Sequence, residues 1–477
     1  MCVRACVCVV CLVMRHSSKA RMSKKRKVDI RDFFRSLLCP VKVLRSDDDS
    51  ILLEWLNSRS HDYTSPKIQN ELLSIMANYI VRDIATEIRS QPELQYSIII
   101  DGTHDITGTE QESICLRYVD HDLIPHEVFV GLYEVSLTIG QNLANVAKDV
   151  LLRLNLSLDG LWGQTYDGAA NMSGKYAGAQ AYLAQAQPLA LFVHCGPHCV
   201  NLITQATCAA SSVVRDALQW VHELGHLFGL SGKFKTIFCN IATSELGSFT
   251  TLKPLCPTRW TVRGAAVKQY DVAQFGGDGF NQWLRNSYEG KWSPRQIQER
   301  EHSAWTPSCF KGVLQDADVQ FRERFHQTSL EILQKLENVL VNGKRDAIVD
   351  QYPEINRRML DVQLAMFKSK NTYISSTGAA DILRGMLPEV RGLFDQVEVL
   401  VRLLLIVPTS STEAERSFSA LRRLKTWLRN CMKQKRLNNV AVCHIHQKRV
   451  DALDRKKICQ EFISANDRRQ HVFGSFG

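Results

Sequence analysis

The sequence predicts an α/β protein in which a mixed sheet is interrupted by a large all-α insertion. Over residues 93–210, short apolar runs bounded by turn residues alternate with helical patterns, which is typical of a sheet with helices between its strands. Residues 211–399 then carry mostly helical patterns. With 45% hydrophobic and 23% charged residues, the chain has the composition of a soluble globular protein, which excludes disordered and collagen-like chains.

The predicted organisation follows from the length and from shifts in pattern along the chain. At ~100–200 residues per domain, 477 residues allow two or three domains. The segments are a basic, largely disordered N-terminal segment (1–50), a helical lead-in (51–92), the first part of the sheet core (93–210), the helical insertion (211–399), the end of the core (400–450) and a basic C-terminal tail (451–477).

The N-terminal segment contains a basic cluster typical of nuclear import. Residues 24–28 read KKRKV and follow Met22, so we interpret residues 1–21 as an upstream extension and expect the protein in the nucleus. An exposed basic tail without targeting function is the alternative. The apolar run within residues 1–14 is too short for a bilayer, which needs ~20 residues, and basic residues follow it. We therefore predict no membrane partner.

The first elements are a helix and three strands. Residues 51–92 show apolar residues at helical spacing. Residues 96–100 form a dense apolar run that stops at Asp101, which is typical of a buried central strand. Residues 112–120 alternate between apolar and polar side chains, and residues 127–135 continue the pattern, so they predict the second and third strands.

Strands and helices alternate after the third strand. The elements are an amphipathic helix over residues 143–154, a fourth strand over 161–166 that ends at Asp167, a small-residue helix over 169–186, a fifth strand over 189–193 and a helix from His198 onward. This order, β-β-β-α-β-α-β-α, is the succession of the ribonuclease H-like fold.

The charge distribution leaves two interpretations open. The 59 Lys and Arg exceed the 49 Asp and Glu by ten, which permits contact with a polyanion. Twelve Lys or Arg lie between residues 421 and 457, and that stretch holds only two Asp. It is either a surface that faces phosphates or an ordinary solvated helix face.

The cysteines predict reduced thiols rather than a disulfide scaffold. Their number, fifteen, is odd, they are scattered beyond the first eleven residues, and the chain is long enough to build a core without disulfides. Cys195 and His198 have the spacing of a zinc-binding pair, but no second pair follows at the spacing of a zinc finger. A packed site near the catalytic face of the predicted core is therefore favoured over a bound zinc ion. Residues 443–446 (CHIH) are interpreted as alternating core and surface positions.

Two acids stand where predicted strands end. Asp101 follows the first strand and Asp167 the fourth, and these strands are neighbours in a ribonuclease H-like sheet. Carboxylates that converge there suit Mg²⁺, and two such ions ~3.5–4 Å apart support phosphoryl transfer. A third acid is expected from Glu413 or Glu415, which open a late helix after Pro408. For each Asp alone, a turn or helix-cap role is the alternative.

Five separated segments resemble hAT-family transposases, in the branch of the zinc finger MYM-type 1 proteins. They are residues 98–106 (IIIDGTHDI), 166–174 (YDGAANMSG), 194–202 (HCGPHCVNL), 257–260 (PTRW) and 408–419 (PTSSTEAERSFS). The resemblance implies a ribonuclease H-like core in which Asp101, Asp167 and Glu415 are the catalytic, metal-binding acids of a Mg²⁺-dependent DDE transposase. The sequence departs from the branch at Gly102 and His104, which leaves Asp101 intact.

The resemblance also implies contacts with DNA. Trp260 would lie near a DNA end with Arg259 and His198, because an aromatic face stacks on a displaced base. A core tryptophan is the alternative for Trp260. Relatives carry a zinc-binding module that reads DNA near the N-terminus, whereas residues 35–50 here hold one cysteine, Cys39. That difference argues against full transposition activity.

The late signature implies dimerisation. We expect the apolar residues 399–407, with Phe418, Leu421, Leu424, Trp427 and Leu428, to be buried at a subunit contact. The alternative is that these side chains fill the protomer's own core.

The predicted function is that of a domesticated, transposon-derived protein. We expect it to dimerise and to contact DNA, with no small-molecule substrate, while the activity of its DDE core stays open. Mg²⁺ is the cofactor if the core is active. The alternative is a non-catalytic interaction protein or transcriptional regulator. A general ribonuclease H-type nuclease would leave the insertion and the dimerisation signature unexplained.

Overall fold

A computed structural model describes residues 65–91, 94–210, 307–426 and 429–473, with a few isolated positions between 211 and 306. The chain forms two compact units. The first consists of Met1–His194 with Ile332–Gly477, and the second is Cys195–Glu331. The predicted basic cluster at residues 24–28 lies outside the described residues.

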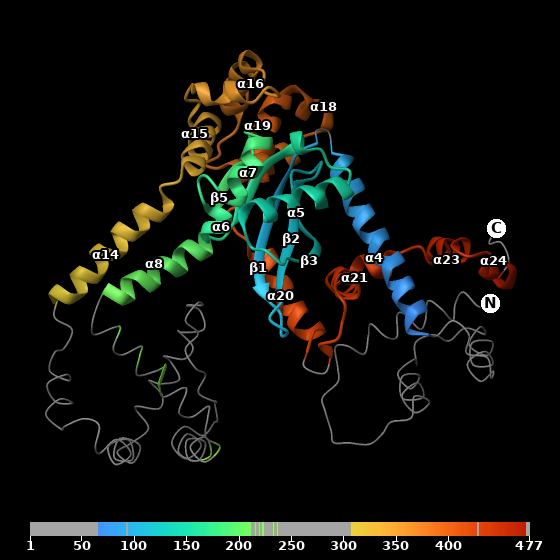
Figure 1. Ribbon diagram of the computed structural model, residues 1–477. Helices are drawn as coiled ribbons and strands as arrows, with labels where there is room; N and C mark the ends of the chain where they lie inside the picture. Colours follow the sequence, from blue (N-terminus) through green and yellow to red (C-terminus); the bar gives the residue numbers. More distant parts are fainter. Residues whose placement is uncertain are drawn as a thin grey trace, which may run out of the picture. The chain divides into compact units, whose positions relative to one another are not determined.

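A mixed sheet is the centre of the first unit (Figure 1). Within the described residues its order is β3-β2-β1-β4-β5. The strands are β1 (Tyr96–His104), β2 (Glu110–Val119), β3 (Pro125–Glu134), β4 (Leu161–Tyr166) and β5 (Leu191–His194). The first three are antiparallel, whereas β4 runs parallel to β1 and β5 parallel to β4. The predicted α/β class with a mixed sheet is confirmed.

Helices cover both faces of this sheet. Ser113 and Tyr118 lie five residues apart on β2, so their side chains point to opposite faces. Ser113 accepts a hydrogen bond from Ser417 on α20 (Thr412–Leu424), and Tyr118 donates one to Glu87 on α4 (Pro66–Arg89). The helices α5 (Gly140–Arg153), α6 (Ala170–Ser173) and α7 (Ala179–Ala186) connect the strands, together with η1 (Leu158–Gly160).

The small-residue segment forms two helices where one was predicted. Between α6 and α7 the backbone of Gly178 comes so close to Gly174 that an added Cβ at Gly178 would lie 2.3 Å from the Gly174 nitrogen. A continuous helix does not bring two backbone segments this near, so the chain turns there before α7 begins.

Residues 332–399 belong with the sheet, although the sequence placed them in the insertion. Trp162 on β4 packs against Tyr352 with ring centroids 5.6 Å apart, and both side chains are buried. The elements of this segment are the rest of α15 (Thr328–Asn342), η2 (Ala347–Gln351), α16 (Arg357–Lys370), α17 (Ser376–Arg384), α18 (Pro388–Arg391), η3 (Gly392–Phe394) and the start of α19 (Asp395–Ile406).

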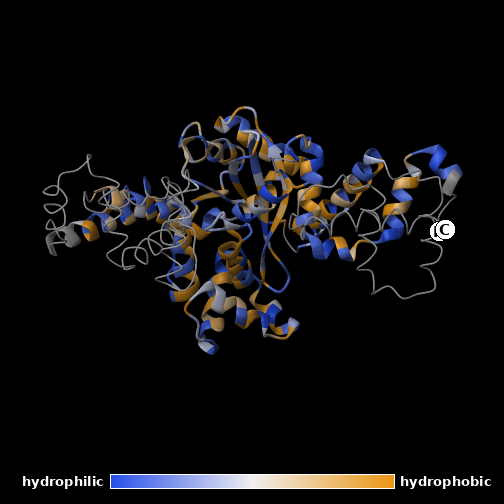
Figure 2. Cartoon of the chain, turned by 90° about the horizontal axis from the view of Figure 1, so that it is seen from below, coloured by the Kyte–Doolittle hydropathy of each residue, from blue (hydrophilic) through white to orange (hydrophobic). Residues whose placement is uncertain are grey.

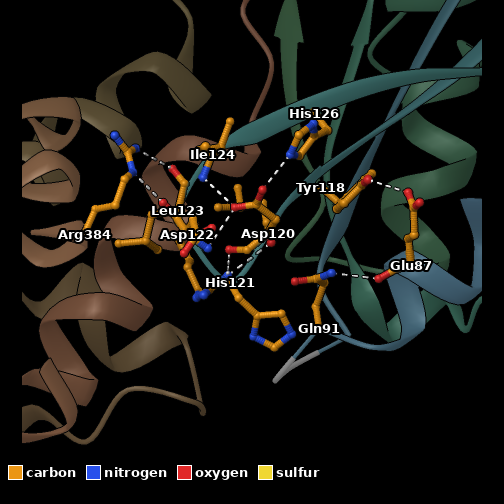
Figure 3. Close-up of polar contacts among 12 residues, drawn as sticks. Glu87, Gln91, Tyr118, Asp120, His121, Asp122, Leu123, Ile124, His126 and Arg384 are labelled. Atoms are coloured by element: carbon orange, nitrogen blue, oxygen red, sulfur yellow. Dashed lines mark hydrogen bonds and ion pairs between the residues drawn. The ribbon is translucent and has the colours of Figure 1, made fainter. Parts of the chain in front are cut away.

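Three arginines hold this segment on the turn between β2 and β3. Figure 3 shows Arg384 beside Asp122 and Leu123 of this turn. Arg384 donates to the Asp122 carbonyl at 2.7 Å and Arg391 to the His121 carbonyl at 2.6 Å. Arg402 donates to the Asp120 carbonyl at 2.9 Å and is buried. Because these carbonyls face away from the strand ladder, the guanidinium groups satisfy acceptors that the sheet leaves open.

The C-terminal part is helical and docked, not a tail. It contains α21 (Gln434–Ile445), α22 (Gln447–Ala452), α23 (Arg455–Ser464) and α24 (Asp467–Phe473). Ile458, Phe462 and Ile463 on α23 are buried in the core that α4 shares. Hydrophilic residues prevail on the helices near the C-terminus in Figure 2, which explains why the sequence alone indicated a basic tail.

In the second unit, α8 (Gly196–Ala210) packs against α14 (Pro307–Phe325). Within α14, Phe321 and Phe325 stack with ring centroids 4.6 Å apart. Among the described helices of the whole chain, none combines the length and apolar character that a membrane crossing requires.

Candidate acidic site

Asp101 and Asp167 reach the same level of the sheet from adjacent strands. Ile99 on β1 pairs with Thr165 on β4, and each acid stands two residues further along its own strand direction. Adjacent strands lie ~4.8 Å apart, so the two carboxylates start from neighbouring backbone positions. Asp167 directly follows β4, as predicted, and its carboxylate accepts a hydrogen bond from the Ala169 N–H at 3.1 Å. β1 continues beyond Asp101 to His104, because its antiparallel pairing with β2 extends further.

Glu415 is brought to this edge by α20. The Ser417 hydroxyl, two residues later on the same helix, donates to the Ser113 hydroxyl at 2.7 Å, and both side chains are buried. Ser113 is the β2 partner of Asp101. The first turn of α20 is therefore fixed over the strand pair that carries Asp101.

The electrostatics show that the three predicted acids influence one another. Burial, followed by the negative charges of Glu415 and Asp167, raises the pKa of Asp101 to about 8. Like charges disfavour the ionised form of a neighbouring carboxyl group at short range. Acids from three distant parts of the sequence thus share one electrostatic environment.

Glu112 is a fourth acid of the site, and sequence reasoning missed it. It pairs with Gly102 across the β1–β2 hairpin and is 3% exposed. Burial, then the charges of Glu110 and Asp167, raise its pKa to about 8. Its Oε2 atom is buried and has no hydrogen-bond partner among the described residues. The hairpin register was the available signal, because it places Glu112 opposite the unusual glycine.

Gly102 makes room for these glutamates. A Cβ added at Gly102 would lie 3.0 Å from one carboxylate oxygen of Glu112 and 3.1 Å from an oxygen of Glu110. Glu110 in turn makes an ion pair with His104 at 2.8 Å. The two departures from the family pattern, Gly102 and His104, therefore both contact glutamates of β2.

A buried ion pair anchors the end of the hairpin beside the site. Lys425 and Asp105 form it, and both side chains are almost fully buried. Burial by itself would raise the pKa of Asp105, but hydrogen bonds from Lys425 and Thr107 outweigh it and hold this pKa below its usual value. Gln111 and Gln434 bond each other at 3.0 Å nearby, which ties β2 to α21.

The residues fit a hard divalent cation in ligand type. Carboxylate oxygens are the donors that Mg²⁺ prefers, and the unpartnered Glu112 oxygen adds another donor of the same kind. Among the described residues, no three His, Cys, Asp or Glu side chains stand in an arrangement that could hold a metal ion. Cation binding by Asp101, Asp167 and Glu415 therefore stays a prediction.

The predicted DNA contacts are not among the described residues of the first unit. His198 lies on α8 in the second unit, while Arg259 and Trp260 lie outside the described residues. The neighbouring Cys199 is buried, and burial raises the pKa of its thiol to about 11. None of the seven described cysteines is in a disulfide.

The predicted basic stretch is partly structural. Three of its members make specific contacts: Lys425 with Asp105, Arg436 with Asn70, and Arg449 with Glu87. The other nine are exposed: Arg422, Arg423, Arg429, Lys433, Lys435, Lys448, Arg455, Lys456 and Lys457. In residues 443–446, Cys443 is buried and His446 bonds the Phe129 carbonyl at 2.7 Å, which are core roles.

The predicted subunit contact is wrong for the residues that the structure describes. From residue 399 to 407, all but the partly buried Val399 and Leu404 are buried within the protomer. Phe418, Leu421 and Leu424 belong to its core, each 2% exposed. A side chain that is already covered gains little from a partner. Trp427 and Leu428 lie outside the described residues.

Comparisons with known proteins agree with the motifs. The family model described as "ZMYM1/FAM200, RNase-like domain" matches residues 1–178, and the hAT family C-terminal dimerisation region matches residues 387–448. The human "52 kDa repressor of the inhibitor of the protein kinase" is 24% identical over 213 residues. That alignment covers 43% of this chain and 27% of the human protein, so the chain spans about a quarter of its relative's length. The resemblance inferred from the motifs is confirmed.

Proposed function

We propose that this hAT-transposase-derived chain, with its RNase-like domain and dimerisation region, self-associates, contacts DNA and binds divalent cations at Asp101, Asp167 and Glu415. The proposal rests on the placement of the three acids: Asp101 and Asp167 each stand two residues beyond the paired Ile99 and Thr165, and α20, which carries Glu415, is bonded to the β2 partner of Asp101. The charges of Glu415 and Asp167 also help raise the pKa of Asp101. Groups with strongly shifted pKa values gather at functional sites more often than elsewhere.

The chain's own residues supply the positioning. β1 holds Asp101, the turn bonded to Ala169 holds Asp167, and the docked α20 holds Glu415. A bound Mg²⁺ would supply Lewis acidity toward a phosphodiester and charge neutralisation among the carboxylates. Such a site suits phosphoryl transfer on DNA.

DNA contact rests on the exposed basic residues. Nine Lys and Arg between residues 421 and 457 are exposed, and phosphate neutralisation by such residues supplies most of non-specific DNA affinity. We also assign the protein to the nucleus, on the basic cluster at residues 24–28.

Metal-dependent nicking of DNA tests the enzymatic part. The full chain is incubated with supercoiled plasmid and Mg²⁺ or Mn²⁺, beside Asp101→Asn and Asp167→Ala. Asp122→Asn is the matched control, since it removes an acid from the turn between β2 and β3. We expect nicking by the wild type and by the control only. Equal nicking by wild type and Asp167→Ala would remove the enzyme proposal.

A non-catalytic interaction protein is the second candidate. The human relative is named as a repressor, and a repressor needs binding rather than cleavage. Under this proposal, Asp101→Asn combined with Asp167→Asn retains both self-association and DNA binding, and the wild type shows no metal-dependent nicking. The nicking assay on the wild type separates the two candidates, while sedimentation and gel-shift measurements on the double variant test the binding that it retains.

A further inference from the structure

At the short helix α18, Arg391 faces inward, whereas Glu389 and three large apolar side chains on the helix and beside it stay exposed. Arg391 makes an ion pair with Glu398 at 2.7 Å and donates to the His121 carbonyl, and its side chain is 19% exposed. Leu387, Val390 and Leu393 are 70%, 41% and 61% exposed. We call these three residues the α18 face.

This arrangement leaves apolar side chains in water and takes a charged side chain out of it, which is the opposite of the usual distribution. Single exposed apolar residues are common on protein surfaces, but grouped ones mark contact sites. Here the three large apolar side chains fall within seven residues. The ion pair and the bond to the hairpin fix the orientation, so the exposure is a consequence of the packing.

The position of the α18 face in the chain points to its partner. It lies in the matched dimerisation region, residues 387–448. Among the described residues of that region, Leu387, Val390 and Leu393 are the large apolar side chains that stay exposed. The others, on α19, α20 and α21, fill the protomer's own core. Within the described part of the region, apolar surface for association is therefore left on α18 and η3.

A second apolar stripe flanks this surface. Met359, Val362 and Met366 on α16 are each more than half exposed. At 100° per residue they fall within an arc of about 60° on the helix. α16 packs on η3, where Phe367 and Phe394 meet edge to face at a centroid distance of 5.2 Å. Leu393 directly precedes Phe394, so the α18 face adjoins the helix that carries the stripe.

We propose that the α18 face, extended by the α16 stripe, is the surface through which two copies of this chain associate. The inference rests on the self-association proposed above and names its surface. In a two-fold contact the same patch is used on both subunits, so each apolar residue contributes twice. Removing these side chains from water stabilises the pair.

Sedimentation of the full chain over a range of concentrations tests this surface. The variant carries Leu387→Glu and Leu393→Glu, which place charges in the contact. The matched control is Leu152→Glu, which changes an apolar residue 77% exposed on α5. We expect a wild-type dimer, an unchanged control and association weakened at least ~100-fold in the double variant. Circular dichroism verifies that all three chains are folded.

A photo-crosslinking amino acid at Val390 gives an independent readout that needs no disruption. We expect a covalent dimer from the Val390 position and none from Leu152. If the wild type dimerises and the double variant dimerises equally well, the α18 face is wrong while self-association stands. If the wild type is a monomer at every concentration, the proposed self-association fails, and this surface with it.

Discussion

At the scale of single residues, two carboxyl groups with raised pKa values distinguish the acidic site. Glu112 is the more deeply buried, and its pKa lies near 8 because burial and the charges of Glu110 and Asp167 oppose ionisation. In the unfolded chain the pKa of the same group is about 4.3. The folded state therefore binds an extra proton between those pH values, and stability falls as pH rises through that window.

We predict that Glu112→Gln removes much of this pH dependence. At pH 8.5 the free energy of unfolding of the variant should exceed that of the wild type by roughly 3 kcal/mol, so the variant unfolds at a higher urea concentration. At pH 4 the two proteins should differ little in stability. Glu134→Gln, at an exposed glutamate on β3, is the control. Unfolding is followed in EDTA, so that no cation stabilises the acids. A wild type equally stable at both pH values would contradict the assignment.

Cation binding should release protons near neutral pH. At pH 7 Asp101 and Glu112 are largely protonated, because their pKa values lie near 8, and a bound cation favours the ionised forms. Calorimetry with Mn²⁺ in two buffers of different ionisation enthalpy measures the release. We expect it at pH 7 and little of it at pH 9. An identical binding enthalpy in both buffers at pH 7 would count against the site.

The residue scale also shows what the sequence allowed. Strand ends and motifs predict Asp101, Asp167 and Glu415, and the charges of Glu415 and Asp167 contribute to the raised pKa of Asp101. Glu112 was missed because a buried acid inside a strand has no periodicity of its own. Its significance comes from the hairpin register, which pairs it with Gly102.

At the scale of elements, the arginine contacts to the turn between β2 and β3 are a long-range connection. Arg402 is buried and bonds Glu398 as well as the carbonyls of Val119 and Asp120. Burial by itself would raise the pKa of Glu398, but hydrogen bonds from Arg391 and Arg402 outweigh it and hold this pKa below its usual value.

We predict that Arg402→Ala lowers the free energy of unfolding by about 3 kcal/mol, because it removes a buried guanidinium group and leaves the half-buried Glu398 carboxylate without one of its partners. Arg402→Lys should recover only part of the loss, since an ammonium group does not reproduce the fork of donors. Arg384→Ala, at the more exposed member, should cost about 1 kcal/mol. Denaturant titrations of the three variants measure these differences. Equal losses at Arg402 and Arg384 would show that burial does not matter here.

Strands were easier to predict than the late helices. β4 was predicted over the residues that form it, because a buried run bounded by turns is distinctive. Residues 400–406, by contrast, are dense in apolar residues, a pattern that does not separate a strand from a helix, and they lie in α19. A fully buried helix loses its polar face, and with it the periodicity that identifies it.

At the scale of the whole molecule, the sequence does not distinguish a protomer core from a subunit contact. Both require apolar side chains at helical spacing, and only the three-dimensional neighbours differ. The largely buried residues 399–407 and the exposed α18 face illustrate the two cases within one matched region.

DNA binding should depend steeply on salt. We predict that changing Arg455, Lys456 and Lys457 to Gln weakens binding to random duplexes and lowers the slope of log affinity against log salt by roughly 2–3. The control changes Lys344, Arg345 and Lys370 to Gln, which removes the same charge from residues outside the basic stretch. Fluorescence anisotropy at several salt concentrations measures both slopes. Equal effects of the two triple variants would argue against a defined phosphate-facing surface.

The docking of α23 and α24 on α4 has a consequence for synthesis in the cell. Arg469 pairs with Glu71 across 398 positions of the chain and stacks on Phe462. On the ribosome, α4 therefore emerges long before the segments that cover it. The apolar side of this helix stays uncovered until α23 and α24 have been synthesised, which favours binding of chaperones to the nascent chain.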